Sequence, residues 1–179
     1  MFIFFVSCII LRQSQSNKTS MEITLLQPQE ISTYTDLYLK FIDYLRVQCK
    51  EVFFEYIPEI KQKLIPYFER CLRDPNHAIY VAKEKDEIIG FIAGDIRYSF
   101  FPYSSMGKIA YISSVYIAEG VRRKGLTRIF ENHITENFFR KNNVEYIELH
   151  CLTNNMVAKK CWENLGYSTF REQLRKKLV

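Results

Sequence analysis

The sequence predicts a domain of the α/β (α+β) class, in which one mixed β-sheet carries helices on both faces. Two observations predict this class. Strand-like and helix-like segments follow one another in the order β-α-α-β-β-β-α-β-α-β, and three of the strands are consecutive in mid-chain. Consecutive strands do not fit a doubly wound parallel sheet, so part of the sheet must be antiparallel. With 179 residues, 47% of them apolar, the chain is long enough for one domain with a sizeable core.

The first third of the chain contains one strand and two helices. Residues 22–26 form a short apolar run that predicts the first strand. Apolar residues recur at helical spacing from Ile31 to Leu45 and predict the first helix. A second helix is expected from Glu59 to Arg73, and it should end before the Asp74-Pro75 pair because the residue before a proline disfavours the helical conformation.

The middle of the chain is strand-rich. Residues 77–83 and 88–97 predict a β-hairpin that turns at residues 84–87. An aromatic loop follows at residues 100–105, and Ile109 to Ala118 predict a long strand.

The last third alternates helices and strands. Apolar residues at helical spacing from Leu126 to Phe138 predict a third helix. A strand is expected at residues 144–152, and a short helix at residues 157–165 should stop at Gly166. Residues 167–178 are interpreted as a last, charged strand.

Residues 1–20 are interpreted as a leader outside the domain of residues 21–179. Residues 1–11 are almost wholly apolar, but they are too short to span a bilayer, which takes about 20 residues. They also lack the basic start and the cleavage site of a signal peptide. Three interpretations stay open: an upstream start with Met21 as the functional start, a membrane-contacting or lipid-anchored terminus, and a disordered leader. No stable membrane insertion is expected.

Cysteine, histidine and charge counts restrict the class of function. The five cysteines are odd in number and have no CxxC spacing, and the three histidines lack zinc-finger or HExxH spacing. These counts predict reduced thiols in a cytoplasmic protein without a bound metal. The net charge of +5 suits an anionic cofactor but is too small to indicate nucleic-acid binding.

The segment from Val115 to Thr127 is the most informative part of the chain. An apolar strand runs into a loop with two glycines and three consecutive cations, and a helix pattern begins at once. Free amides at a helix N-terminus bind anions, and glycine lets the backbone approach a phosphate closely. The segment therefore predicts a phosphate or pyrophosphate site, with a solvated basic turn as the alternative. The GxxxxGK[ST] and GxGxxG patterns of nucleotide- and dinucleotide-binding loops are absent.

Two partial motifs give the chain a family resemblance. Residues 122–127, Arg-Arg-Lys-Gly-Leu-Thr, fit the pattern Q/R-x-x-G-x-G/A except at the last position. A second pattern, N-x-x-A-x-x-x-Y-x-x-x-G-F/Y, is matched except at the tyrosine by Asn155, Ala158, Trp162, Gly166 and Tyr167. Over residues 22–179 the chain thus resembles the GNAT superfamily of acyl-CoA-dependent N-acyltransferases.

This resemblance implies a fold and a cofactor site. The fold would be a mixed, mostly antiparallel sheet of six to seven strands with about four helices, splayed where acetyl-CoA binds. The pantetheine arm would pair with the strand residues Val115, Tyr116 and Ile117. Asn155 would bond the pantetheine amide or cap its helix. The pyrophosphate would be held by the loop residues Arg122, Arg123, Lys124, Gly125, Leu126 and Thr127.

The resemblance also suggests catalytic residues. Acetyl transfer to an amine requires loss of an amine proton, stabilisation of an oxyanion and protonation of the leaving thiolate. His150 takes the place of a glutamate that serves as base in one branch of the family, and Glu119 is a second candidate base acting through water. Trp162 stands where many members have a tyrosine acid. An indole is too weak an acid for that task, so Trp162 is also interpreted as a packed aromatic residue, with Tyr111, Tyr116 and Tyr167 as alternative acids.

The predicted acceptor is a primary amine of a small molecule or peptide. The segments 53–59 and 98–103 are aromatic, and Glu51, Glu55 and Glu59 add carboxylates, which suits a cationic amine such as a polyamine, aminosugar, lysine or N-terminus. We expect direct attack in a ternary complex, no nucleic-acid partner and no metal, and a homodimer is left open. The alternative is a catalytically degenerate acyl-CoA-binding module.

Overall fold

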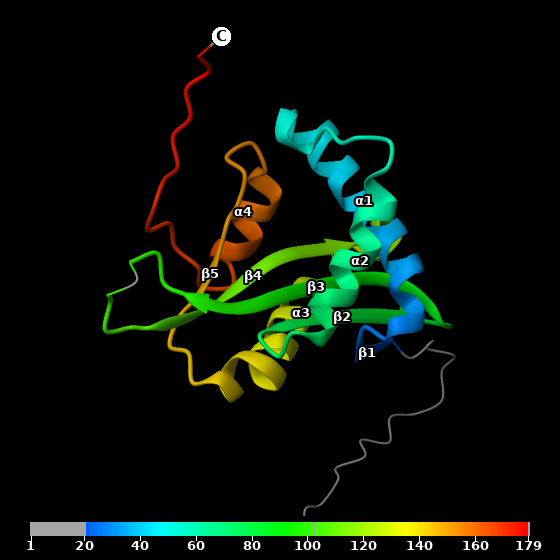
Figure 1. Cartoon of the computed structure of the whole chain (residues 1–179), viewed down its shortest axis with the longest axis horizontal. Coiled ribbons are helices and arrows are strands. Elements are labelled where there is room, and N and C mark those ends of the chain that lie inside the picture. The colour runs from blue at the N-terminus through cyan, green and yellow to red at the C-terminus, as the bar shows by residue number, and fades with distance from the viewer. Residues whose placement is uncertain (1–20, 102, 179) are drawn as a thin grey trace, which may run out of the picture.

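The computed structural model of the chain describes residues 21–101 and 103–178 (Figure 1). The predicted leader, residues 1–20, lies outside the described residues together with its cysteine, Cys8. Pro102 lies outside them too. The described part forms one sheet with helices on both faces, which confirms the predicted α+β class.

The sheet holds its five described strands in chain order, from β1 at one edge to β5 at the other. The pairs from β1 to β4 are antiparallel, whereas β4 and β5 are parallel because a helical crossover separates them. The bounds are Glu22–Leu25 for β1, His77–Glu84 for β2, Glu87–Tyr98 for β3, Lys108–Ile117 for β4 and Ile147–Leu149 for β5.

The predicted hairpin is confirmed as β2 and β3. Its two connecting residues, Lys85 and Asp86, both have positive φ, at 51° and 66°. Two such residues form the type I′ turn, whose twist matches that of paired strands.

Within the described residues, four α-helices cover the sheet. The first two, α1 (Ile31–Cys49) and α2 (Ile60–Arg73), are close to the expected bounds. The third, α3 (Leu126–Ile134), continues as a π-helix over Thr135–Phe139, so the helical segment extends to the predicted end. The fourth, α4 (Met156–Glu163), has two turns and lies beside β5 in Figure 1.

The core has one layer on each face of the sheet. On one face Tyr34 of α1 and Phe68 of α2 pack against Phe91 of β3. On the other face Phe130 of α3 packs with Ile92. Because Phe91 and Ile92 are consecutive, their side chains point to opposite faces, and the uninterrupted apolar run of β3 follows from its burial on both sides.

A β-bulge interrupts the pairing of β3 with β4. Ala93 is opposite Ser114 and Gly94 is opposite Ile112, so Ser113 is the extra residue. The bulge reverses the alternation of side chains along β4: Ile112 before it and Val115 after it belong to the same core layer.

Two strand predictions are wrong in extent. Residues 167–178 form no strand, and the described part of the chain contributes five strands to the sheet, where six to seven were expected. The predicted strand over residues 144–152 is reduced to the three residues of β5. An edge strand this short offers few backbone groups to a further neighbour. The C-terminal segment is held instead by side chains: Arg175 forms two hydrogen bonds to Glu51 (2.9 and 3.0 Å), and Phe170 packs near Phe100.

His133 predicts how stability depends on pH. It lies on α3 with its ring edge-to-face against Tyr80 (4.7 Å between centroids), and burial lowers the pKa of His133 below 6.5. Below that pH the unfolded chain takes up more protons at this position than the folded chain, so the free energy of unfolding should fall as the pH is lowered through 6.5. Denaturant titrations at pH 7.5 and 5.5 should show a smaller drop for His133→Gln than for the wild type. An equal drop in both proteins would contradict this role of His133.

Candidate active site

The sheet opens between β4 and β5. Their pairing consists of Ala110 with Ile147, Tyr111 with Glu148, and Ile112 with Leu149. There β5 ends, whereas β4 continues to Ile117. Within the described chain, the outer edge of β4 from residue 113 to residue 117 therefore has no ladder partner, and an unpaired edge is a template for an added strand. Val115, Tyr116 and Ile117, the predicted pantetheine residues, all lie on this open edge.

The loop after β4 leads directly into α3. A 3-10 turn, Glu119–Val121, is followed by Arg123 with φ 64° and by Gly125 with φ 76° at the N-cap of α3. The first amides of the helix, from Leu126 and Thr127, have no carbonyl partner inside a helix. A Cβ on Gly125 would meet no atom within 4 Å, so open space lies in front of this backbone. The loop thus combines free amides with room for an anion.

The three consecutive cations have different surroundings. The Arg122 side chain turns back: its Nε donates to the carbonyl of Ile117 (2.9 Å), and its guanidinium lies 4.9 Å from the ring centroid of Tyr44. Arg123 and Lys124 are exposed and form no ion pair with a described carboxylate. The side chains of Arg123 and Lys124 are therefore accessible to an anion, whereas Arg122 holds the loop to β4 and α1.

Asn155 is the N-cap of α4. Its Oδ1 accepts a hydrogen bond from the amide of Ala158 (3.2 Å), which is the capping role left open as an alternative. The neighbouring Asn154 donates from Nδ2 to the carbonyl of Cys49 (3.3 Å). This contact joins the start of α4 to the end of α1, although 105 positions separate the two residues in the chain.

The three candidate catalytic residues are not brought together by β4. His150 follows β5 at once, with its ring edge-to-face with Tyr111 (5.5 Å) and its Nε2 3.4 Å from Arg171. Glu119 comes after the far end of β4, whose last four residues beyond Ser113 span about 13 Å of strand. Trp162 packs in the core layer of α3 and edge-to-face against Tyr167 (5.2 Å), as expected for a packed aromatic residue.

The alternative acids also differ in their surroundings. The Tyr167 hydroxyl donates to Glu131 on α3 (3.3 Å), and burial together with that carboxylate raises the pKa of Tyr167. Burial likewise raises the pKa of Tyr111, whose ring carries the Arg97 guanidinium 3.6 Å from its centroid. Tyr116 packs against Phe91 in the opposite core layer from Trp162.

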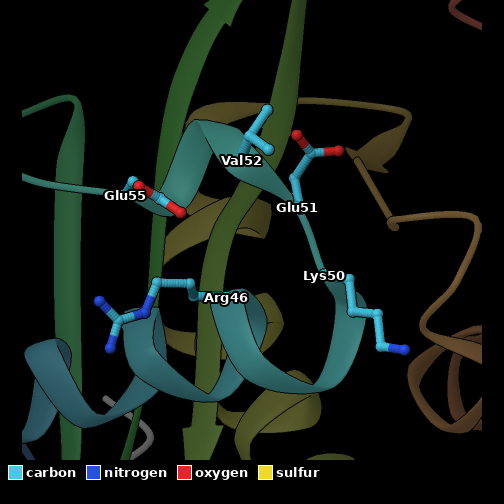
Figure 2. Close-up of a pocket in the computed structure, with 5 residues that line it drawn as sticks. All are labelled: Arg46, Lys50, Glu51, Val52 and Glu55. Atoms are coloured by element: carbon cyan, nitrogen blue, oxygen red, sulfur yellow. The ribbon is translucent and has the colours of Figure 1, made fainter.

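The connection between α1 and α2 forms a shallow pocket of about 290 Å³. Figure 2 shows Arg46 and Glu55 on one side of it and Lys50 and Glu51 on the other. Both signs of charge line it, and Glu51 is held by Arg175. Glu51 was predicted to attract a cationic amine, but in the structure its carboxylate already has a cation.

The polar groups on the sheet under α2 were not predicted. Asp95 of β3 is 5% exposed and holds Arg97 through two hydrogen bonds of 2.6 Å. An acid and a base two residues apart in an otherwise apolar strand indicate that these side chains share one face, and this signal was available in the sequence. A second unpredicted group is the hydroxyl of Tyr34, which is fully buried and has no hydrogen-bond partner in the described chain.

The thiols, carboxylates and imidazoles of the described chain are dispersed. Its residues contain no group of three or more His, Cys, Asp or Glu side chains that is arranged to hold a metal ion. Cys49, Cys71, Cys151 and Cys161 are free thiols. None of the described helices is long and apolar enough to cross a bilayer.

A mixed sheet that opens beside a glycine-containing helix N-terminus is the architecture of an acetyltransferase, and comparison with known proteins agrees. The chain belongs to the acetyltransferase (GNAT) family, whose model matches residues 40–167. No curated protein sequence matches the chain significantly.

Solved structures with the same fold include several acetyltransferases. A predicted acetyltransferase from Clostridium acetobutylicum, solved with acetyl-CoA, is 19% identical, with a TM-score of 0.71 over 89% of this chain and 97% of that one. The aminoglycoside N-acetyltransferase AAC(6')-Iy, solved with CoA, is 12% identical, with a TM-score of 0.72 over 93% and 100%. The BH1408 protein from Bacillus halodurans, as a tetramutant, is 18% identical, with a TM-score of 0.75 over 88% and 99%. At these identities the likeness concerns the fold.

Proposed function

We propose that the protein transfers an acetyl group from acetyl-CoA to a primary amine by direct attack in a ternary complex. The observation that carries this proposal is the unpaired edge of β4 beside the loop of residues 122–127. The edge supplies backbone groups for the pantetheine amides, and the loop supplies amides and cations for the pyrophosphate. The family match and the CoA-bound neighbours support acetyl-CoA as the donor.

Each predicted cofactor residue has a proposed task. The outward-facing backbone groups of Val115 pair with the pantetheine arm, while Tyr116, whose carbonyl faces Gly90 of β3, holds the strand in place. The carbonyl of Ile117 accepts a bond from Arg122, so Ile117 contributes chiefly through its amide. The amides of Gly125, Leu126 and Thr127 face the pyrophosphate, with Arg123 and Lys124 adding charge. Asn155 caps α4 with its oxygen, which leaves its Nδ2 to donate to the pantetheine.

The transfer itself requires a base. The base takes one proton from the ammonium group, and the neutral amine nitrogen then attacks the thioester carbonyl carbon. The bond from that carbon to sulfur breaks, and the second proton lost by the nitrogen goes to the thiolate. We propose His150 as the base, because it follows β5 at the point where the sheet opens. Glu119 is the second candidate, at the cofactor end of β4. The packing of Trp162 against Tyr167 supports a structural role for Trp162, with water delivering the proton to the thiolate.

His150→Ala should change the pH profile of turnover. Without a base, turnover depends on the free amine, which becomes scarce as the pH falls, so kcat should drop most below neutral pH and by about 10²-fold or more. The matched control is His133→Ala, which removes a histidine from the opposite face of the sheet. Rates measured from pH 6 to 9 check this prediction, and a profile like that of the wild type would exclude His150 as the base.

Two measurements on the full chain test the function. Calorimetry measures acetyl-CoA binding, and a thiol-release assay then screens polyamines, aminosugars, amino acids and basic peptides. Binding with thiol release supports the enzyme. Binding without release from any amine would favour a degenerate acyl-CoA-binding module, and no binding would contradict the cofactor assignment. The free thiols support a cytoplasmic location as part of the proposal.

A further inference from the structure

The C-terminal segment joins the two aromatic stretches that were predicted to line the acceptor site. Residues 167–178 follow α4 as an extended trace without helix or strand (Figure 1). The Arg171 guanidinium lies 5.1 Å from the ring centroid of Phe100 in the loop after β3. Further along, the Arg175 guanidinium lies 4.5 Å from the ring centroid of Phe53, between α1 and α2. The segment therefore contacts both stretches and belongs to the same surface.

This segment also contacts the proposed base. Nη2 of Arg171 lies 3.4 Å from Nε2 of His150. A guanidinium group has donors and no acceptor, so the imidazole nitrogen accepts this long hydrogen bond. The lone pair that would take a proton from the acceptor amine is then occupied by Arg171. A substrate that offers the guanidinium another partner would release the lone pair of the base.

Arg97 is a second cation in this part of the surface, but its charge is compensated. It holds the buried carboxylate of Asp95 through two hydrogen bonds of 2.6 Å, and its guanidinium lies 3.6 Å from the ring centroid of Tyr111. The same ring is edge-to-face with His150. Arg171, by contrast, forms no ion pair with a described carboxylate. The uncompensated positive charge beside the proposed base is therefore that of Arg171.

A carboxylate shares this face of the sheet with His150. Ile147 and Leu149 of β5 belong to the core layer of α3, so Glu148 between them points to the opposite face. His150 is the next alternate residue and lies about 7 Å further along the chain. Glu148 is half-buried and forms no ion pair in the described chain. A ligand at His150 thus meets one negative and one positive group, which suits a zwitterion.

We propose that the acceptor is a free amino acid, whose amine is deprotonated by His150 and whose carboxylate is bound by Arg171. The two nitrogen atoms are 3.4 Å apart, so they fit an amine and a carboxylate on the same carbon. A guanidinium group binds a carboxylate through two parallel hydrogen bonds. Polyamines and aminosugars lack the carboxylate, and Glu51, which was expected to attract such cations, is paired with Arg175. The inference rests on the proposed transferase function and names its substrate class.

Matched amines test the inference on the wild-type protein. Each standard amino acid is compared with its amino alcohol, which keeps the side chain and the primary amine but replaces the carboxylate by a neutral hydroxymethyl group. For the best amino acid, we expect kcat/KM for thiol release from acetyl-CoA to exceed that of its amino alcohol by about tenfold or more. Equal or higher values with amino alcohols, polyamines or aminosugars would overturn the inference and leave the transferase function intact. No thiol release from any amine would overturn both.

Arg171→Gln tests the contact with the carboxylate. The KM for the best amino acid should rise about tenfold or more, whereas the KM for its amino alcohol should not rise and the Kd for acetyl-CoA should stay unchanged. Arg171→Lys keeps the charge and should recover part of the loss. Arg140→Gln is the matched control, because Arg140 is an exposed arginine bonded to Glu136 in the helical segment after α3.

Two results with these variants would overturn the role of Arg171. An unchanged KM for the amino acid in Arg171→Gln would show that its carboxylate binds elsewhere. An equal rise in KM for the amino acid and for its amino alcohol would show that Arg171 only holds the C-terminal segment in place.

Discussion

Gly125→Glu should abolish the binding of acetyl-CoA, with a rise in Kd of at least about 100-fold. Gly125 is the N-cap of α3, and open space lies where its side chain would be. A glutamate there places a negative charge against the pyrophosphate and fills the space that the phosphate needs. The loss of two charge-assisted hydrogen bonds, at about 1.5 kcal/mol or more each, accounts for the expected factor. Calorimetric titration with acetyl-CoA measures it.

A control must separate this effect from backbone strain. Gly125 has φ 76°, a left-handed conformation that costs any other residue about 1–2 kcal/mol. Gly107 has φ 61° with no atom near the position of its Cβ, so Gly107→Glu has the same backbone cost away from the loop. It should bind acetyl-CoA like the wild type. If folded Gly125→Glu also kept its affinity, the pyrophosphate site would have to lie elsewhere.

Gly94→Val should have the largest effect on stability, a loss of about 3 kcal/mol in the free energy of unfolding. A Cβ on Gly94 would lie 2.7 Å from Cζ of Phe139, 2.9 Å from the carbonyl oxygen of Tyr111 and 3.0 Å from Cδ1 of Ile134. One of these atoms is backbone and two belong to buried core side chains, so none can move away without disturbing the β3–β4 pairing or the packing of α3.

Urea denaturation of Gly94→Val and Gly120→Val tests this close approach. A Cβ on Gly120 would meet no atom within 4 Å, so valine there should change the midpoint little. Equal midpoints for the two variants would contradict the tight packing of Gly94.

Most local elements could be predicted from the sequence because their causes lie within a few residues. The turn at residues 84–87 follows from a short polar sequence between two apolar strands, and Lys85 and Asp86 adopt the turn conformation. The N-terminus of α3 at Gly125 follows from a glycine placed before an amphipathic pattern. The charged strand predicted at residues 167–178 is wrong because a strand needs a neighbouring edge, and alternation along one segment does not reveal whether an edge is within reach.

The sequence predicted some parts of the candidate site and missed others, because it shows local features and not contacts between segments. The loop of residues 122–127 is contiguous, so the sequence alone could predict its position before α3, and its binding of a phosphate stays a prediction. Arg122 bonds to the nearby Ile117, whereas its contact with the ring of Tyr44 brings two distant segments together. The pairing of Glu51 with Arg175 does the same. Tyr34 belongs to a helical apolar stripe in the sequence, and only its burial in the fold shows that its hydroxyl has no hydrogen-bond partner in the described chain.

By itself, the sequence determined the class of fold, the order of most of its elements and the position of the glycine-containing loop before α3, because periodicity, turn residues and helix starts are local properties of the chain. The tertiary structure decided where β4 and β5 separate, which of the three loop cations bonds within the protein, and which buried hydroxyl has no partner in the described chain. Each of these depends on side chains and strand edges that lie side by side in the fold but come from different segments of the chain. The packing of two core layers on one sheet determines these contacts, and no single segment of the sequence specifies them.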